Sequence, residues 1–227
     1  MNIIVTGASR GIGIELAKTF AENSENKVIV IARNKEKLEQ LEKQFKNITA
    51  LTYDLNLDNY NILVTDISKT FNKVDILINN AGIIINKPFK DITLSEINNI
   101  FQVNVFSVAL LIQNLLPMMN VNSHIVNIGS MGGFLGSSKF TGLSIYSASK
   151  AALANLSECL AEELKEQKIF VNCLAIGAVQ TEMLNEAFPG YKAPLSANEM
   201  SQFIANFALT GHKFFNGKVL PVSSSTP

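Results

Sequence analysis

Residues 6–13 read Thr-Gly-Ala-Ser-Arg-Gly-Ile-Gly and join a short apolar run, 3–6, to a stretch with helical periodicity, 11–21. Glycines at such a turn let backbone N–H groups approach a pyrophosphate closely, and the positive end of the helix dipole stabilises the anion. The spacing departs from the usual Gly-x-Gly-x-x-Gly, because three residues separate the first two glycines. We expect phosphate contacts here, the alternative being a glycine turn without a ligand; the residues concerned are Gly7, Ser9, Arg10, Gly11, Ile12 and Gly13.

The rest of the chain alternates short β-branched runs with stretches of helical period. The expected strands are 3–6, 27–32, 49–54, 74–79, 123–128, 170–175 and 218–222, and the main expected helices are 11–21, 35–45, 59–71, 94–116, 144–165 and 198–208. This alternation predicts an α/β fold: a single-domain Rossmann-type, doubly wound parallel sheet of seven strands with helices on both faces. Pro221 cannot donate a hydrogen bond to a neighbour, so the last strand is expected at an edge.

The 227 residues fit one dinucleotide-binding and catalytic domain, 1–227, since single α/β domains commonly reach about 250 residues. Neither a linker nor a repeat interrupts the pattern. Residues 182–197 have weak periodicity and are expected to form a mobile substrate lid.

Composition narrows the classes of function. With 19 Lys+Arg against 19 Asp+Glu, the net charge of zero argues against a nucleic-acid partner. The start of the chain lacks a secretory pattern, and the apolar stretch 108–119 is shorter than the ~20 residues of a membrane span, so a buried helix is expected there. Two cysteines cannot build a disulfide framework, which favours the cytoplasm. His124 and His212 are isolated, and no metal site is expected.

Several further segments follow the order of one known family. Asn79-Asn80-Ala81-Gly82 comes after the fourth expected strand, Val103-Asn104-Val105 lies in the long helix, and Tyr146-Ser147-Ala148-Ser149-Lys150 opens the next one. Gly177-Ala178-Val179-Gln180-Thr181 follows the sixth strand. Together with the glycine turn, these segments resemble the classical short-chain dehydrogenase/reductase (SDR) family over most of the chain. The resemblance implies an oxidoreductase that uses NAD(P)(H) and acts on an alcohol or carbonyl group.

Tyr146 and Lys150 carry the chemistry. Residues four apart on a helix share a face, so the ammonium can lie near the phenol. A nearby cation favours phenolate and lowers a phenol pKa that is ordinarily about 10. Tyr146 can then exchange a proton with a carbonyl or alcohol oxygen while hydride moves to or from the nicotinamide. A surface pair without a catalytic role is the alternative for Tyr-x-x-x-Lys alone.

The resemblance completes the catalytic set with Ser130 and Asn104. Ser130 ends the fifth expected strand, where its hydroxyl could bond the substrate oxygen. The gap to Tyr146 is longer than usual in the family, which indicates a small insertion at 136–142 and leaves Ser137, Ser138 and Ser144 as rivals. Asn104 falls on the apolar face of its helix, and in the family this position holds a water linked to the lysine. An asparagine satisfied by a kink in the helix backbone is the structural interpretation of the same position, and it does not exclude the water relay.

The resemblance also assigns contacts to the cofactor. An acidic residue after the third strand receives the adenine amino group, the Asn-Asn-Ala-Gly element lies against the adenosine half, and the segment after the sixth strand holds the nicotinamide carboxamide. Ile176 stands where the family usually has proline, so this last loop is expected to be less rigid. The residues concerned are Asp54, Leu55, Asn80, Ala81, Gly82, Tyr146, Lys150, Val179 and Thr181.

Charge at the end of the second strand predicts the cofactor. Dinucleotide sites that prefer NAD carry an acidic residue there, which binds the ribose 2′-hydroxyl, whereas a 2′-phosphate needs a cation. Ala32 takes the acidic position, Arg33 follows it, and Arg10 supplies a second guanidinium. We expect NADP(H) to be preferred over NAD(H); the alternative is that Arg33 is an ordinary solvated residue.

Apolar residues near the expected site favour a small or medium carbonyl substrate. Three further possibilities stay open: a 3-oxoacyl thioester reductase, a catalytically silent NADP(H)-sensing regulatory protein, and a structural subunit of a larger synthase. A sensor would have no need of Tyr146 and Lys150. The family resemblance also suggests a homodimer or homotetramer, with no nucleic-acid or membrane partner.

Overall fold

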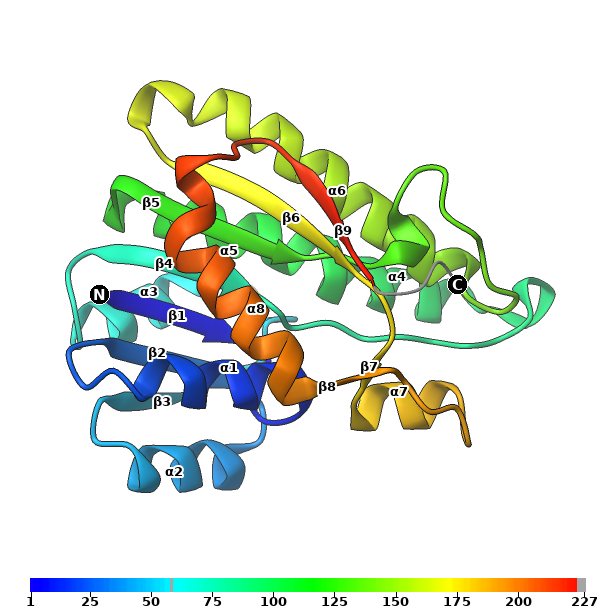
Figure 1. Ribbon diagram of the computed structural model, residues 1–227, viewed down its shortest axis with the longest axis horizontal. Helices are drawn as coiled ribbons and strands as arrows, with labels where there is room; N and C mark the ends of the chain where they lie inside the picture. Colours follow the sequence, from blue (N-terminus) through cyan, green and yellow to red (C-terminus); the bar gives the residue numbers. More distant parts are fainter. Residues whose placement is uncertain (58, 224–227) are drawn as a thin grey trace.

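The computed structural model describes residues 1–57 and 59–223. Its centre is a seven-stranded sheet in the order β3-β2-β1-β4-β5-β6-β9, in which every neighbouring pair is parallel (Figure 1). The predicted fold class is therefore confirmed. The strands are β1(Asn2–Thr6), β2(Lys27–Ala32), β3(Ile48–Thr52), β4(Val74–Asn79), β5(Met119–Ile128), β6(Phe170–Ile176) and β9(Val219–Val222).

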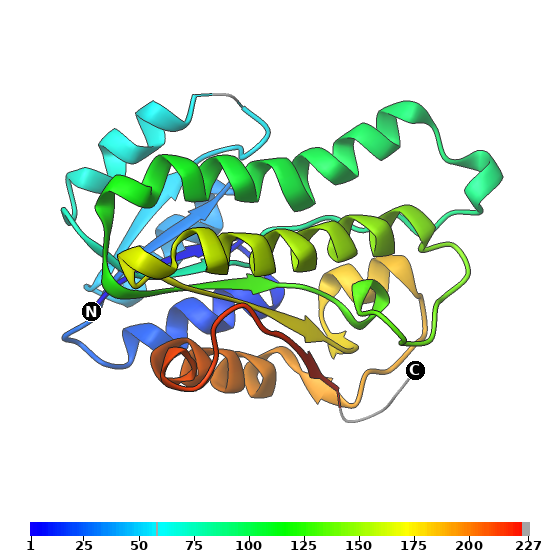
Figure 2. The ribbon, with the colours of Figure 1, turned by 90° about the horizontal axis from the view of Figure 1, so that it is seen from above.

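Helices cover both faces of the sheet (Figure 2). Successive residues of each strand point to opposite sides, so a strand of consecutive apolar residues needs cover on both. Ile3 and Val5 face one apolar core, and Ile4 between them faces the other. The first core is closed by α1(Gly11–Ala21), α2(Lys35–Gln44) and α8(Ala197–Thr210). The second is closed mainly by α3(Tyr60–Ser68), α5(Ser107–Leu115) and α6(Ser144–Glu163), while α4(Leu94–Phe101) continues into α5 through η2.

The topology places a crevice at the carboxyl ends of β1 and β4. From β1 the chain winds outward to β2 and β3, then returns to β4 on the other side of β1. Such a switch point is where open parallel sheets bind ligands. At the far edge, Pro221 lies in β9, which pairs only with β6 among the described strands, and the predicted edge position is confirmed.

The long helix corrects one prediction. It begins at Leu94 and continues to Met118, which makes 25 residues of sufficient length and apolar composition to cross a membrane. The argument from the length of 108–119 is therefore wrong, because the helix starts well before that stretch. Core helices can have the same length and composition, and the predicted burial is found: the residues of this helix that are buried in the second core are Val108, Leu111, Ile112, Leu115 and Met118.

Residues 182–197 are more ordered than their sequence pattern suggests. They contain α7(Glu182–Ala187) and β8(Leu195–Ser196), and β8 pairs with β7(Val179–Gln180) in a separate two-stranded sheet. Thr181 caps α7 by accepting a bond from the Leu184 N–H. The remaining short helical segments are η1(Phe89–Asp91), η2(Gln102–Phe106), η3(Leu116–Met118), η4(Met131–Gly133), η5(Lys165–Gln167) and η6(Gly211–Lys213). Residues 224–227 of the predicted domain lie outside the described part.

Candidate active site

The glycine turn packs tightly against the neighbouring strand ends. Gly7 has φ +68°, a left-handed conformation that favours glycine, and a Cβ there would lie 2.8 Å from the Cα of Ala81. A Cβ on Gly13 would lie 2.3 Å from the Gly7 carbonyl oxygen. Gly13 therefore allows α1 to pack closely against Gly7 and the Asn80 side chain, and it does not line the cleft.

The start of α1 has the features of an anion site. Arg10 is the N-cap residue, and within the described residues its side chain makes no capping bond to the first turn. The first turn also contains no acidic residue. The N–H groups of this turn have no partner inside the helix, so they are available to a phosphate at the positive end of the helix dipole. The turn therefore fits the pyrophosphate of a dinucleotide.

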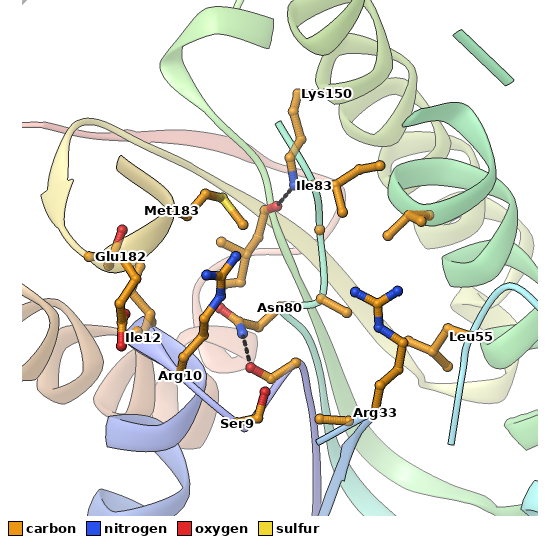
Figure 3. A pocket seen from close by; sticks show the side chains of 18 of the residues that line it. Ser9, Arg10, Ile12, Arg33, Leu55, Asn80, Ile83, Lys150, Glu182 and Met183 are labelled. Carbon is orange, nitrogen blue, oxygen red and sulfur yellow. Dashed lines mark hydrogen bonds between the residues drawn. The ribbon is translucent and has the colours of Figure 1, made fainter. Parts of the chain in front are cut away.

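A cleft of about 240 Å³ opens above this turn at the carboxyl ends of the central strands (Figure 3). Most of the sequence-predicted cofactor residues line it, although Gly13 does not and Val179 lines a neighbouring cavity. The predicted residues that the cleft brings together are Gly7, Ser9, Arg10, Gly11, Ile12, Arg33, Asp54, Leu55, Asn80, Ala81, Gly82, Tyr146, Lys150 and Thr181.

Two guanidinium groups extend into this cleft. Figure 3 shows the side chains of Arg10 and Arg33 reaching into it from the glycine turn and from the end of β2. Ala32 lines the cleft beside Arg33 and brings no negative charge. Arg10 is also paired with Glu186 of α7, and the hydrogen bonds from this guanidinium hold the pKa of the Glu186 carboxyl below its usual range.

The cleft includes residues that the sequence patterns missed. Tyr53 and Asn56 flank Asp54, and Glu182 follows Thr181, whereas the neighbouring Met183 was expected near the site as part of its apolar lining. The Asn56 N–H donates to Asp54 Oδ1 over 3.1 Å, while Asn56 Oδ1 is buried without a hydrogen-bond partner among the described residues. Adjacency to Asp54 and Thr181 was the only available signal, because none of these residue types is diagnostic of a cofactor site.

Asn104 is fully buried in η2, where the long helix widens into a π-helical turn. Its Oδ1 accepts from the Ile83 N–H over 2.9 Å, and its Nδ2 donates to the Ile83 carbonyl and to Ser149 Oγ, each over 3.0 Å. The structural alternative of an asparagine satisfied by its own helix backbone is wrong, since the partners of this side chain lie on two other segments.

Lys150 is buried beside the carboxyl end of β5. Its Nζ donates to the Ile128 carbonyl over 2.8 Å, as Figure 3 also shows. Burial lowers the pKa of Lys150 to about 8, while the neighbouring Cys173 raises it. The ammonium is therefore mostly protonated at neutral pH but close to its titration range.

Tyr146 lies one helical turn before Lys150, and the pKa of its phenol differs from the expectation. Burial raises the pKa of its phenol above the ordinary value, and only a hydrogen bond with Ser130 lowers it. The expected lowering by Lys150 is not found; in this structure the Lys150 Nζ donates to the Ile128 carbonyl. Ser130 Oγ also accepts from the Gly132 N–H over 3.1 Å, which fixes the serine at the end of β5.

A second cavity, of about 310 Å³, adjoins the cleft. Tyr146 lines both spaces, Lys150 lines only the cleft, and Ser130 lines only the second cavity. The described residues around the second cavity include no Asp, Glu, Lys, Arg or His. Besides Ile12, Ile176, Ala178 and Val179, its apolar side chains come from the long loops and the lid: Ile84, Met131, Phe140, Leu143, Met183, Leu184, Phe188 and Tyr191.

The rival serines do not reach either space. Ser137 Oγ donates to the carbonyls of Met131 and Phe134 within its own loop, and neither Ser138 nor Ser144 is among the described lining residues. The extra residues form a loop held together by Lys139, whose Nζ donates to the carbonyls of Gly132 and Phe134.

Comparison with known proteins decides the family. The family model described as short chain dehydrogenase matches residues 1–192. The chain belongs to the short-chain dehydrogenase family. As an SDR oxidoreductase, it is 30% identical over 212 residues to an uncharacterized oxidoreductase of Staphylococcus aureus strain MW2, a match that covers 91% of this chain and 90% of the relative.

Two solved SDR structures have the same architecture. One is a 3-ketoacyl-(acyl-carrier-protein) reductase from Brucella melitensis complexed with NADH, with 27% identity, a TM-score of 0.88 and coverage of 99% of this chain and 97% of the other. The second is a short chain dehydrogenase from Burkholderia cenocepacia J2315 in complex with NADP, with 26% identity, a TM-score of 0.88 and coverage of 99% and 96%. SDR folds of this shape thus occur with either cofactor.

Among residues 1–57 and 59–223, no three His, Cys, Asp or Glu side chains gather in a group that could hold a metal ion.

Proposed function

We propose that this SDR oxidoreductase reduces a small or medium carbonyl compound with NADPH, using Ser130, Tyr146, Lys150 and Asn104. The observation that carries the proposal is the position of Tyr146 on the wall shared by the cleft and the apolar cavity. A group that transfers a proton must reach the substrate oxygen while the substrate contacts the cofactor. The described residues that line both spaces are Ile12, Tyr146, Ile176, Thr181 and Met183, and among them Tyr146 carries the acidic hydroxyl.

Each side chain has one task in this proposal. The phenol of Tyr146 donates its proton to the carbonyl oxygen, and the hydroxyl of Ser130 hydrogen-bonds the same oxygen. Burial keeps the pKa of the phenol above its ordinary value until the proton is transferred. In this proposal the Lys150 ammonium then favours the phenolate that remains, as a cation near a phenolate does. Asn104 acts in the proton relay that the family resemblance implies, and its side chain is held between Ile83 and Ser149. When bound, the nicotinamide cofactor supplies the hydride.

NADP(H) is the proposed cofactor. The first turn of α1 would hold its pyrophosphate, with Gly7, Ser9, Gly11 and Ile12 around it and Gly13 packing the turn against the strand. Arg33 and Arg10 would hold the 2′-phosphate, and the absence of an acidic side chain at Ala32 supports this preference. The other proposed contacts are Asp54, Leu55, Asn80, Ala81, Gly82, Tyr146, Lys150, Val179 and Thr181.

The lining of the second cavity supports an uncharged substrate. A charged group buried there would lack an opposite charge from any described lining residue and would lose its hydration, which is costly. A 3-oxoacyl thioester reductase is the second candidate, because an acyl chain also suits an apolar cavity and one solved relative is described as a 3-ketoacyl-(acyl-carrier-protein) reductase.

The proposal also includes a substrate lid, the domain organisation, the cellular location and the oligomeric state. Residues 182–197 act as a substrate lid, since α7 and the residues after it supply part of the cavity wall. The chain works as one domain in the cytoplasm, as a homodimer or homotetramer, and without a nucleic-acid or membrane partner.

Turnover of a substrate panel tests the proposed function. The purified chain is supplied with NADPH, or NADH in parallel, and with aldehydes, ketones, 2-oxo acids and 3-oxoacyl thioesters, and cofactor consumption is followed. The proposal predicts turnover of neutral carbonyl compounds with NADPH preferred and no turnover of 2-oxo acids. Turnover confined to 3-oxoacyl thioesters would favour the second candidate. Tight NADPH binding without any turnover would favour the silent sensor or the structural subunit.

A further inference from the structure

The lid and the glycine turn are joined by one ion pair. The Arg10 guanidinium donates through both terminal nitrogens to Glu186, over 2.5 Å to Oε1 and 3.3 Å to Oε2. Arg10 lies between Gly7 and Gly11 in the turn, whereas Glu186 lies in α7, the helix of the proposed lid. The pair therefore connects a cofactor-binding segment to a segment that lines the substrate cavity.

The two arginines of the cleft differ in whether a carboxylate pairs with the guanidinium. Arg10 is held by a carboxylate, while Arg33 makes no ion pair with any described residue. A guanidinium presents the same fork of N–H groups to a carboxylate and to a phosphate, so the two anions compete for it. Even without full displacement, the Glu186 charge repels a second anion placed on Arg10.

We propose that Glu186 is a specificity-determining residue that competes with the 2′-phosphate of NADP(H) for Arg10 and thereby couples cofactor choice to the lid. This inference rests on the proposed function, in which Arg10 and Arg33 hold that phosphate. NADH has no 2′-phosphate and leaves the Arg10–Glu186 pair intact. Arg10 and Arg33 make NADPH bind more tightly than NADH, and Glu186 reduces the difference between the two dissociation constants.

The exposure of the pair sets the size of the effect. The side chains of Arg10 and Glu186 are 41% and 61% exposed, so water and salt screen their attraction. Exposed ion pairs contribute little, and we expect removal of the carboxylate to tighten NADPH binding by about two- to five-fold.

Coupling between two sites is reciprocal, so the lid must respond to the cofactor. The neighbouring anchor is a hydrogen bond over 2.8 Å from Asn86 Nδ2 to the Ala187 carbonyl at the end of α7. NADPH removes the Arg10 anchor and leaves the Asn86 anchor, whereas NADH leaves both. The amides of α7 should therefore exchange hydrogen faster with NADPH bound than with NADH bound.

The test measures dissociation constants of NADPH and NADH for the wild type and for Glu186→Gln, which keeps the size of the side chain. Glu162→Gln is the matched control, because Glu162 forms an exposed ion pair with Lys165 in α6 and η5, away from the cleft. We expect Glu186→Gln to tighten NADPH binding about two- to five-fold, leave NADH unchanged, and lose its effect at high salt. In an Arg10→Met background, Glu186→Gln should change neither constant.

Failure of the Glu186 proposal and failure of the proposed function give different results in this experiment. An unchanged NADPH constant in Glu186→Gln, or equal tightening of NADPH and NADH, would overturn the assignment of Glu186 while leaving the proposed function in place. A wild type that binds NADH more tightly than NADPH would instead contradict the proposed cofactor preference. Equal hydrogen exchange of α7 with the two cofactors would overturn the coupling to the lid.

Discussion

Asn104 Nδ2 donates a hydrogen bond to Ser149 Oγ over 3.0 Å and so ties η2 to the helix that carries Tyr146 and Lys150. Ser149 Oγ in turn donates to the Tyr146 carbonyl over 2.7 Å. Because Asn104 also bonds both backbone groups of Ile83, one buried amide joins the cleft wall to α6. The tyrosine is thus positioned through a fully satisfied polar network rather than by apolar packing alone.

Asn104→Ala tests this network. The substitution leaves the Ile83 N–H and carbonyl without their partner, and we expect it to lower the free energy of unfolding by about 2–3 kcal/mol. Denaturation with urea measures the change. Asn114→Ala on the following helix is the matched control, because the side chain of Asn114 bonds, within the described part of the chain, only to the Leu110 carbonyl one turn away. We expect this variant to cost less than about 1 kcal/mol. Equal costs for the two variants would contradict the bridging role.

Lys150→Met should stabilise the fold. Burial lowers the pKa of Lys150 from 10.5 to about 8, so the charged form destabilises the native state near neutral pH. Each pKa unit corresponds to about 1.4 kcal/mol of free energy. Because the variant also loses the hydrogen bond to the Ile128 carbonyl, we expect its free energy of unfolding to rise by about 1–2 kcal/mol in total. Wild-type stability should correspondingly rise as pH increases from about 8 toward 10.5. A destabilised Lys150→Met variant would show that the ammonium favours folding.

Arg33→Ala tests the cofactor preference. The Arg33 guanidinium has no ion-pair partner among the described residues and is therefore available to a phosphate. Its removal should weaken NADPH binding by about tenfold or more and leave NADH binding nearly unchanged. Ala32→Asp should weaken NADPH further and strengthen NADH, since a carboxylate there suits a ribose hydroxyl. Fluorescence titration with each cofactor measures both constants. Parallel weakening of NADPH and NADH by Arg33→Ala would assign Arg33 to a part of the cofactor that both share.

His124 makes stability depend on pH. Burial lowers its pKa to about 4 in the folded chain, against 6.5 for the ordinary group, so the unfolded chain binds more protons between these values. Stability is therefore complete above about pH 6.5 and is lost as pH falls toward 4. We expect the free energy of unfolding to fall by about 2 kcal/mol between pH 7.5 and pH 5.

His124→Gln should remove most of this pH dependence. The neighbouring His212, whose pKa burial also lowers, should retain a smaller dependence of the same sign. Hydrogen bonds with Thr93 lower the pKa of Glu96, so its contribution is present above its ordinary value of 4.5 and is lost mainly below the pH range measured here. A flat stability profile in the wild type would contradict the burial of a neutral imidazole.

The sheet and most of the cleft were predictable because they depend on local patterns. Strand period, helix period and the glycine turn each show in a few consecutive residues. The pairing of Arg10 with Glu186 and the contact of Asn104 with Ser149 were not predictable, since both join residues distant in sequence. The raised pKa of Tyr146 depends on its burial, which residue spacing does not determine.

Turnover by Tyr146→Phe tests the central claim most directly. The variant removes only the hydroxyl, so NADPH should bind with a dissociation constant within about threefold of the wild type. Loss of the proton donor should lower turnover of a carbonyl substrate found for the wild type by about a hundred- to ten-thousand-fold. Turnover within a few-fold of the wild type, with NADPH binding retained, would contradict the claim that Tyr146 transfers the proton.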